Sequence, residues 1–200
     1  LDKLRNTLRT TLIDIWEYVI PIWKISGLFK SIKSKKDLEN FIQERSAHVS
    51  QTTLYGYLKT RIGVKYIAMM EDEVFLKSIN IAKWNIYVVA LADCAFYVFS
   101  YLISEKNLKE NDCKEIFLNI LENEKKNGLS EEIFDRGKTN FLKRLDKVNF
   151  SNYHLNDPFK ESGQALYYWS PIADELKSLD KKIVLNSIHL KWGLMKDEFK

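Results

Sequence analysis

The feature that most constrains this chain is a long apolar stretch with one carboxylate near its centre. Residues 84–104, WNIYVVALADCAFYVFSYLIS, contain no glycine or proline, and Asp93 is the one charged residue among them. The stretch is too long for a strand, so it predicts a helix that is buried on nearly all sides. Because an unpaired buried charge is very costly, Asp93 requires a partner or a chemical purpose.

Two environments suit such a helix, the core of an all-helical domain and a lipid bilayer. The stretch matches the roughly 20 residues that span a bilayer. Against a bilayer, Asn85 and Asp93 lie inside it, and a central Asp costs roughly 3 kcal/mol to insert. Tyr87, Tyr97 and Tyr101 also lie within the stretch rather than only at its ends. We therefore favour a core helix and keep a membrane-spanning helix as the alternative.

Composition supports a folded, intracellular globule. The chain has 200 residues, of which 46% are hydrophobic, and its seven glycines and three prolines are few for the turns of a β-sandwich or barrel. Its 31 basic and 27 acidic residues are interspersed, so we expect no nucleic-acid partner. Cys94 and Cys113 do not make a disulfide framework, which suits a reducing compartment and a cytoplasmic protein.

Helical spacing and capping residues predict an all-α bundle of about six helices around a central apolar helix at about 73–104. Ser34 and Asp37 form a capping-box-like start for a helix that runs to about Gly63. Asn111 or Asp112 starts the helix after the central one.

The later part of the chain carries further helix signals. Gly128 ends one helix in the position that needs left-handed geometry, and Ser130 caps the next. Residues 149–163 form the longest irregular segment. Ser170 with Pro171 predicts the start of the last helix. Its apolar stripe consists of Ile172, Leu176, Leu179, Ile183, Leu190 and Leu194, and Trp192, Met195 and Phe199 extend the apolar surface to the end of the helix.

The first residues form a separate region. Residues 3–20 predict an amphipathic helix, with Leu4, Leu8, Leu12, Ile15 and Val19 at helical spacing, and Pro21 interrupts it. The segment after it packs on the core or makes a peripheral contact with the inner membrane through residues 12–33. We divide the chain into this N-terminal helix and connector at 1–33 and a helical core at 34–200, together one compact domain.

One face of the helix at 34–62 is unusually polar and could serve the buried carboxylate. Its candidate site residues are Arg45, His48, Gln51, Tyr55 and Arg61. If that face packs near Asp93, it can bind a small polar ligand or use His48 in acid–base work. The alternative, which we favour, is a structural network in which Arg45 or Arg61 neutralises Asp93.

Lys83 belongs to a second polar set, close to the first if the two helices are antiparallel. It is most simply an end residue whose ammonium reaches solvent, and a reactive lysine with a shifted pKa is the alternative. The three histidines lie far apart and no Glu-x-x-His or Cys-x-x-Cys occurs, so we expect no metal site. Without a phosphate loop or dinucleotide fingerprint, we expect no cofactor.

Three blocks of the chain resemble an alphaproteobacterial family of uncharacterised all-helical proteins. The blocks are RSAHVSQTTLYGYLKTRIG at 45–63, DEVFLKSINIAKWNIY at 72–87, and ALYYWSPIADELK at 165–177 with IVLNSI at 183–188. They span most of the chain beyond residue 40. Some members are labelled esterase, so the resemblance implies ester hydrolysis, without a catalytic assignment for any residue here.

Two functions remain from the sequence. The first is a non-enzymatic helical protein that binds a partner protein or a small polar ligand in the cytoplasm, or beside the inner membrane. The alternative is a small esterase-like hydrolase that lacks the G-x-S-x-G elbow. For that reaction the chain offers His48 as a base, or His154 beside Ser162 and Gly163 in the irregular segment.

Overall fold

A computed structural model describes residues 32–199, and within them the chain is all-α, with no strand. The helix expected at 3–20, and all of the proposed membrane-contact segment 12–33 except its last two residues, lie outside this part. The elements are α2 (Lys35–Ile62), η1 (Gly63–Lys65), α3 (Tyr66–Met69), α4 (Glu73–Ser104), α5 (Glu110–Lys126), α6 (Glu131–Leu145), η2 (Tyr153–Leu155), α7 (Lys160–Trp169) and α8 (Asp174–Phe199).

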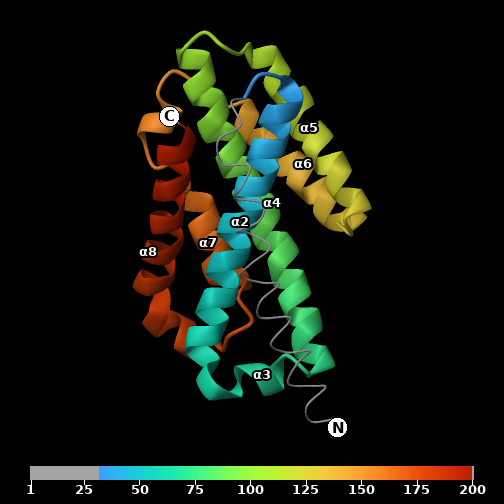
Figure 1. Cartoon of the computed structure of the whole chain (residues 1–200), viewed down its shortest axis with the longest axis vertical. Helices are drawn as coiled ribbons and strands as arrows, with labels where there is room; N and C mark the ends of the chain where they lie inside the picture. The colour runs from blue at the N-terminus through green and yellow to red at the C-terminus, as the bar shows by residue number, and fades with distance from the viewer. Residues whose placement is uncertain (1–31, 200) are drawn as a thin grey trace.

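The apolar stretch forms the second half of α4, and α4 is the central helix of the bundle, as its sequence predicts. It packs against α2, α5, α6 and α7, so that other helices surround it (Figure 1). Leu91, Phe96 and Phe99 on α4 are fully buried. Among the described residues α4 is the one helix long and apolar enough to cross a membrane, and 78% of its most apolar window is buried. Burial inside the fold accounts for its apolarity without a bilayer.

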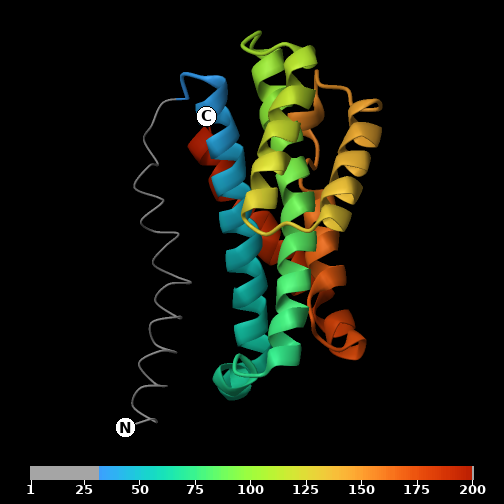
Figure 2. The ribbon, with the colours of Figure 1, turned by 90° about the vertical axis from the view of Figure 1, so that its right-hand side faces the viewer.

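Helix ends follow the capping residues closely. The Asp37 amide donates to Ser34 Oγ at 3.1 Å and the Ser34 hydroxyl donates to the Asp37 carboxylate at 2.8 Å, which starts α2. Gly63 ends α2 with φ +63°. Gly128, with φ +102°, follows the end of α5, and Ser130 precedes α6. After α4, α5 runs back along its side, and α6 then turns and runs in the direction of α4 again (Figure 2).

Of two expectations for the end of the chain, one holds in part and one is wrong. In the segment 149–163, residues 149–159 lie between α6 and α7 and include η2, whereas residues 160–163 form the first turn of α7. Ser170 ends α7 rather than starting α8, and its hydroxyl donates to the Leu166 carbonyl at 2.6 Å. The cause is Pro171, because the residue before a proline favours extended backbone, and Ser170 has ψ 127°. α8 therefore begins only after the turn, at Asp174.

The expected apolar stripe of α8 does not face the core. Of its six residues Ile172, before the helix, packs against the core, and the other five are exposed. The core instead receives the opposite face of α8, which consists of Val184, Ile188, Trp192 and Met195. α8 is thus apolar on two opposite faces, and the packing of α2 and α7 decides which of them is buried.

Candidate functional site

Asp93 lies fully buried in the middle of α4 and is held from two later helices. The Arg144 guanidinium, on α6, donates to Asp93 Oδ1 at 2.7 Å. The backbone amide of Ser162, in the first turn of α7, donates to Oδ2 at 2.7 Å. A carboxylate at the amino end of a helix is favoured by the helix dipole as well as by the amide. Both oxygens of Asp93 therefore have a partner.

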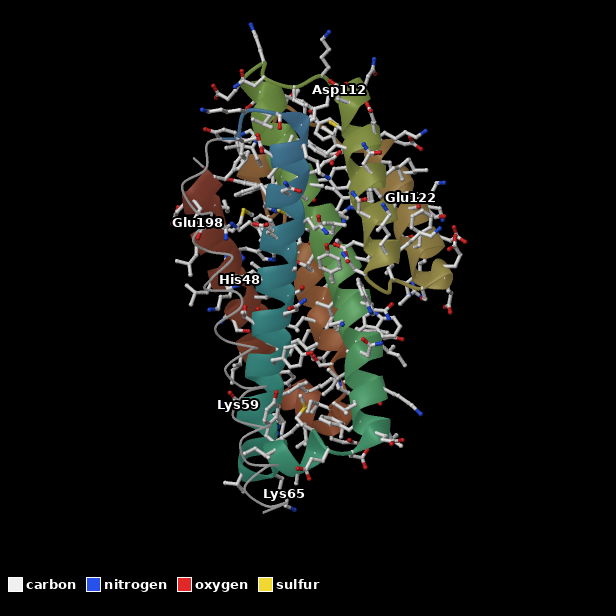
Figure 3. All side chains as sticks on the ribbon, turned by 45° about the vertical axis from the view of Figure 1, so that its right-hand side comes forward. His48, Lys59, Lys65, Asp112, Glu122 and Glu198 are labelled. Atoms are coloured by element: carbon white, nitrogen blue, oxygen red, sulfur yellow. The ribbon has the colours of Figure 1, made fainter. Side chains whose placement is uncertain are left out.

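The partners expected from the sequence are not the ones that Asp93 has. Arg45 binds Glu198 at 2.9 Å and Arg61 binds Asp180 at 3.2 Å, both on α8. The polar face of α2 is turned toward α8, and Figure 3 shows His48 and Glu198 on that side. Tyr55 packs half-buried against the core on α2. The structure therefore leaves Asp93 out of this polar set.

His48 lies in a cationic corner of the α2–α8 interface. Partial burial, together with Lys191 and Arg45, lowers the pKa of His48 below its ordinary value. Its Nδ1 atom is buried and has no hydrogen-bond partner among residues 32–199. Such surroundings favour the neutral ring, and within the same residues no carboxylate orients it for base catalysis.

Burial raises the pKa of Asp93 to about 6, although Arg144 and the Ser162 amide favour its charged form. For Arg144, burial opposes the charged form, but Asp93 and Tyr153 raise the pKa of the guanidinium overall. Arg144 also donates to the Tyr153 hydroxyl at 2.8 Å and lies 4.7 Å from the centre of the Phe96 ring. These contacts fix the position of the Arg144 guanidinium in the fold.

A cavity of about 720 Å³ opens beside Arg144, between α4, α6 and α7. Its floor on α4 is apolar, with Val88, Val89 and Ala92. Its charged lining has four cations and two carboxylates, which are Arg136, Lys143, Arg144, Lys160, Asp157 and Glu161. Its volume lies in the range of small-molecule sites, about 300–1,000 Å³.

Arg136 is the second fixed cation of this cavity. It donates to the Asn85 side-chain oxygen, and the Asn85 amide in turn donates to the Ile81 carbonyl at 2.8 Å. The guanidinium carbon lies 5.6 Å from the centre of the Trp169 ring. Its partner Glu132, at 3.6 Å, is on the solvent side. Arg136 is therefore oriented from α4 and α7 before any ligand enters.

A smaller cavity of about 320 Å³ brings together two residues that the sequence singled out, Gln51 and Lys83. Its buried carboxylate, Glu124, was not expected. It accepts from Tyr87 at 2.5 Å, from Gln43 at 2.6 Å and from Asn127 at 3.0 Å. Burial lowers the pKa of Lys83, and Glu124 opposes that shift. The polar face of α2 and the polar set around Lys83 thus meet at this cavity, as the sequence suggested, but the cavity does not include Asp93.

The serine and histidine considered for hydrolysis do not form a pair. The Ser162 hydroxyl is fully buried, donates to the Phe159 carbonyl at 2.9 Å and accepts from Trp192 Nε1 at 3.0 Å. His154 Nδ1 instead lies 2.8 Å from Ser100 Oγ. The single proton of that buried hydroxyl goes to the Phe150 carbonyl at 2.6 Å. Neither serine presents an accessible nucleophile at the histidine.

The residues that the sequence reasoning missed carry a readable pattern. Arg136, Asn140, Lys143 and Arg144 recur at helical spacing and form one polar face of α6.

In residues 32–199, no group of three or more His, Cys, Asp or Glu side chains is arranged to hold a metal ion. Comparison of the chain with family models, curated proteins and solved structures gives no match.

Proposed function

We propose that this protein binds a small anionic molecule with an apolar portion in the α4–α6–α7 cavity. The observation that carries the proposal is a pair of guanidinium groups fixed at the cavity wall before binding. Arg136 is held by Asn85 and Trp169, and Arg144 is held by Asp93 and Tyr153. Their side chains remain 41% and 27% exposed, respectively, so both still reach the cavity.

Pre-positioning matters because it lowers the entropy cost of binding. A guanidinium matches a carboxylate, phosphate or sulfonate with two parallel hydrogen bonds, and a fixed guanidinium loses less freedom when it makes them. Lys143 and Lys160 add positive charge at the same cavity. The apolar floor of Val88, Val89 and Ala92 gives a hydrocarbon or ring portion a surface to cover.

The buried carboxylate has a positioning role in this proposal. Asp93 does not line the cavity, and it acts through Arg144. Its link to the Ser162 amide joins the same ion pair to α7, the helix that carries Trp169.

We further propose that the protein is cytoplasmic, because Cys94 and Cys113 are both free and buried, as in proteins of reducing compartments.

A pair of fluorescent probes tests the proposal. Anilinonaphthalene sulfonate carries an aromatic body and an anion, and N-phenylnaphthylamine has the same body without the anion. We expect the wild-type chain to bind the sulfonate more tightly. Arg136→Gln should weaken sulfonate binding about tenfold, a loss of about 1.4 kcal/mol, and leave the neutral probe unchanged.

Lys65→Gln is the matched control, because Lys65 is an exposed cation on η1, outside the cavity. It should bind both probes like the wild-type chain. If R136Q and K65Q bind the sulfonate equally well, or if the wild-type chain does not distinguish the two probes, the cavity is not an anion site.

A further inference from the structure

The outward face of α8 carries a row of large apolar side chains. Its members are 42% to 75% exposed, and they are Leu176, Leu179, Ile183, Leu190 and Leu194, here called the α8 stripe. The stripe lies opposite the face that packs on α2 and α7, and α8 itself lies at the edge of the bundle in Figure 1. Single exposed leucines are ordinary, but an aligned row along one helix marks an interaction surface.

The spacing of the stripe is that of a helix-pairing seam. Leu176, Ile183 and Leu190 are seven residues apart, and Leu179 precedes Ile183 by four. Apolar residues at this spacing pack against the same face of another helix. From Leu176 to Leu194 the stripe is about 27 Å long at the rise of an α-helix. A polar residue, Asn186, lies within the seam, where such residues fix the register of a pair.

We propose that the α8 stripe packs antiparallel against the α8 stripe of a second copy of this chain. The stripe is nearly symmetric about residue 185. Leu176 and Leu194 each lie nine residues from residue 185, and Leu179 and Leu190 lie six and five residues from it. A two-fold interface pairs the same surface on both subunits, so that surface must complement itself. A row that is symmetric about its midpoint meets this requirement when the two helices are antiparallel.

Charges beside the stripe favour the same direction. On the edge that faces α2, Asp180 comes before the midpoint and Lys191 after it, at nearly equal distances along the helix. Antiparallel packing puts the same edge of both helices together, so it brings Asp180 of each copy toward Lys191 of the other. Parallel packing places this edge of one helix against the opposite edge of its partner and makes no such pairs. Opposite charges across an interface favour binding, so the antiparallel pair is preferred. One helix face is a small interface, so the dimer depends on concentration.

Sedimentation of the full 200-residue chain over a concentration series tests the dimer. We expect the weight-average mass to rise from 23.6 kDa toward twice that value. Ile183→Glu should hold the mass at the monomer value, because it puts a charge in the middle of the seam. Val74→Glu is the matched control, since Val74 is 73% exposed on α4, outside the stripe, and it should dimerise like the wild-type chain.

Cysteine cross-linking tests the direction of the helices. Leu176→Cys mixed with Leu194→Cys should cross-link, and Leu176→Cys alone should not; cross-linking of L176C to itself would show a parallel pair and overturn the proposal. Native Cys94 and Cys113 are fully buried and give little background. A wild-type chain that stays monomeric overturns the dimer. Slow maleimide labelling of Leu190→Cys would then show that another part of the chain covers the stripe.

Discussion

At the scale of single residues, the fold prefers Asp93 in its protonated form. Its pKa is about 6 in the folded chain, against an ordinary value of 3.8. Burial is the cause, and Arg144 with the Ser162 amide offsets only part of it. Near neutral pH the ionised carboxylate is thus maintained at a cost in stability. In the function proposed above, the ionised carboxylate holds Arg144 in place for binding. That role would explain why the chain keeps a buried Asp that lowers its stability.

The sign of this effect gives a pH prediction. A raised folded-state pKa means that the stability contributed by protonated Asp93 is fully present below pH 3.8 and is lost as pH rises through about 6. Asp93→Asn lacks this titration. We expect the unfolding free energy of the wild-type chain, minus that of D93N, to fall by about 1.4 kcal/mol per pH unit between pH 4 and 6. Urea unfolding at several pH values measures it.

Asp174→Asn serves as the control for this series. Asp174 is 92% exposed and pairs with Lys177 on the surface of α8, where ion pairs contribute little. We expect D174N to change the unfolding free energy little, because the Asp174 carboxylate lies in solvent. A flat difference for D93N would mean that Asp93 titrates near its ordinary value.

The sequence predicted that Asp93 needs a partner, but it did not predict which partner. Arg45, Arg61 and Arg144 are equally suitable by charge, and nothing local separates them. Arg144 lies 51 residues beyond Asp93, so the pair exists only because α6 packs along α4. The helix caps, by contrast, could be predicted from the sequence. Ser34 accepts a hydrogen bond from the amide of Asp37, only three residues away, so its role depends on neighbouring residues alone.

At the scale of helices, α6 reaches α4 closely because Gly137 has no side chain. A Cβ at Gly137 would collide with Val88 on α4 and would touch Leu121 on α5. Val88 lines the proposed site, so this close approach also sets the width of the cavity between α4 and α6. α8 shows the opposite situation. Both of its faces are apolar, so sequence periodicity found a stripe but could not tell which stripe the neighbouring helices would cover.

Alanine substitutions at two helical glycines test the α4–α6 contact. Gly137→Ala should lower the unfolding free energy by about 2 kcal/mol, because overpacking outweighs the gain in helix propensity. Gly56→Ala, in α2, has nothing within 4 Å of the added Cβ and should raise the unfolding free energy by up to about 1 kcal/mol. Equal effects of G137A and G56A in denaturant unfolding would show that α6 has room to move.

At the scale of the whole molecule, a chain of contacts joins three helices beneath the cavity. Trp192 on α8 stacks on Phe159 with ring centres 4.3 Å apart and donates to Ser162 Oγ. The Ser162 amide then holds Asp93 on α4. The core side of α8 therefore supports the site, while its outward stripe is exposed and is the surface that we propose for a second copy. The two proposed surfaces use opposite faces of one helix.

This separation predicts that dimerisation and anion binding are independent. α8 and α6 lie on opposite sides of α2 and α4 in Figure 1, and no residue of the α8 stripe lines the cavity. Coupling between two sites requires that each ligand favours a different state of a shared element, and the stripe and the cavity share no residue. We therefore expect Ile183→Glu to bind anilinonaphthalene sulfonate like the wild-type chain, and Arg136→Gln to keep the wild-type dimer. A tenfold loss of sulfonate binding in I183E would instead locate the probe on the stripe, or reveal a coupling of about 1.4 kcal/mol that passes through Trp192.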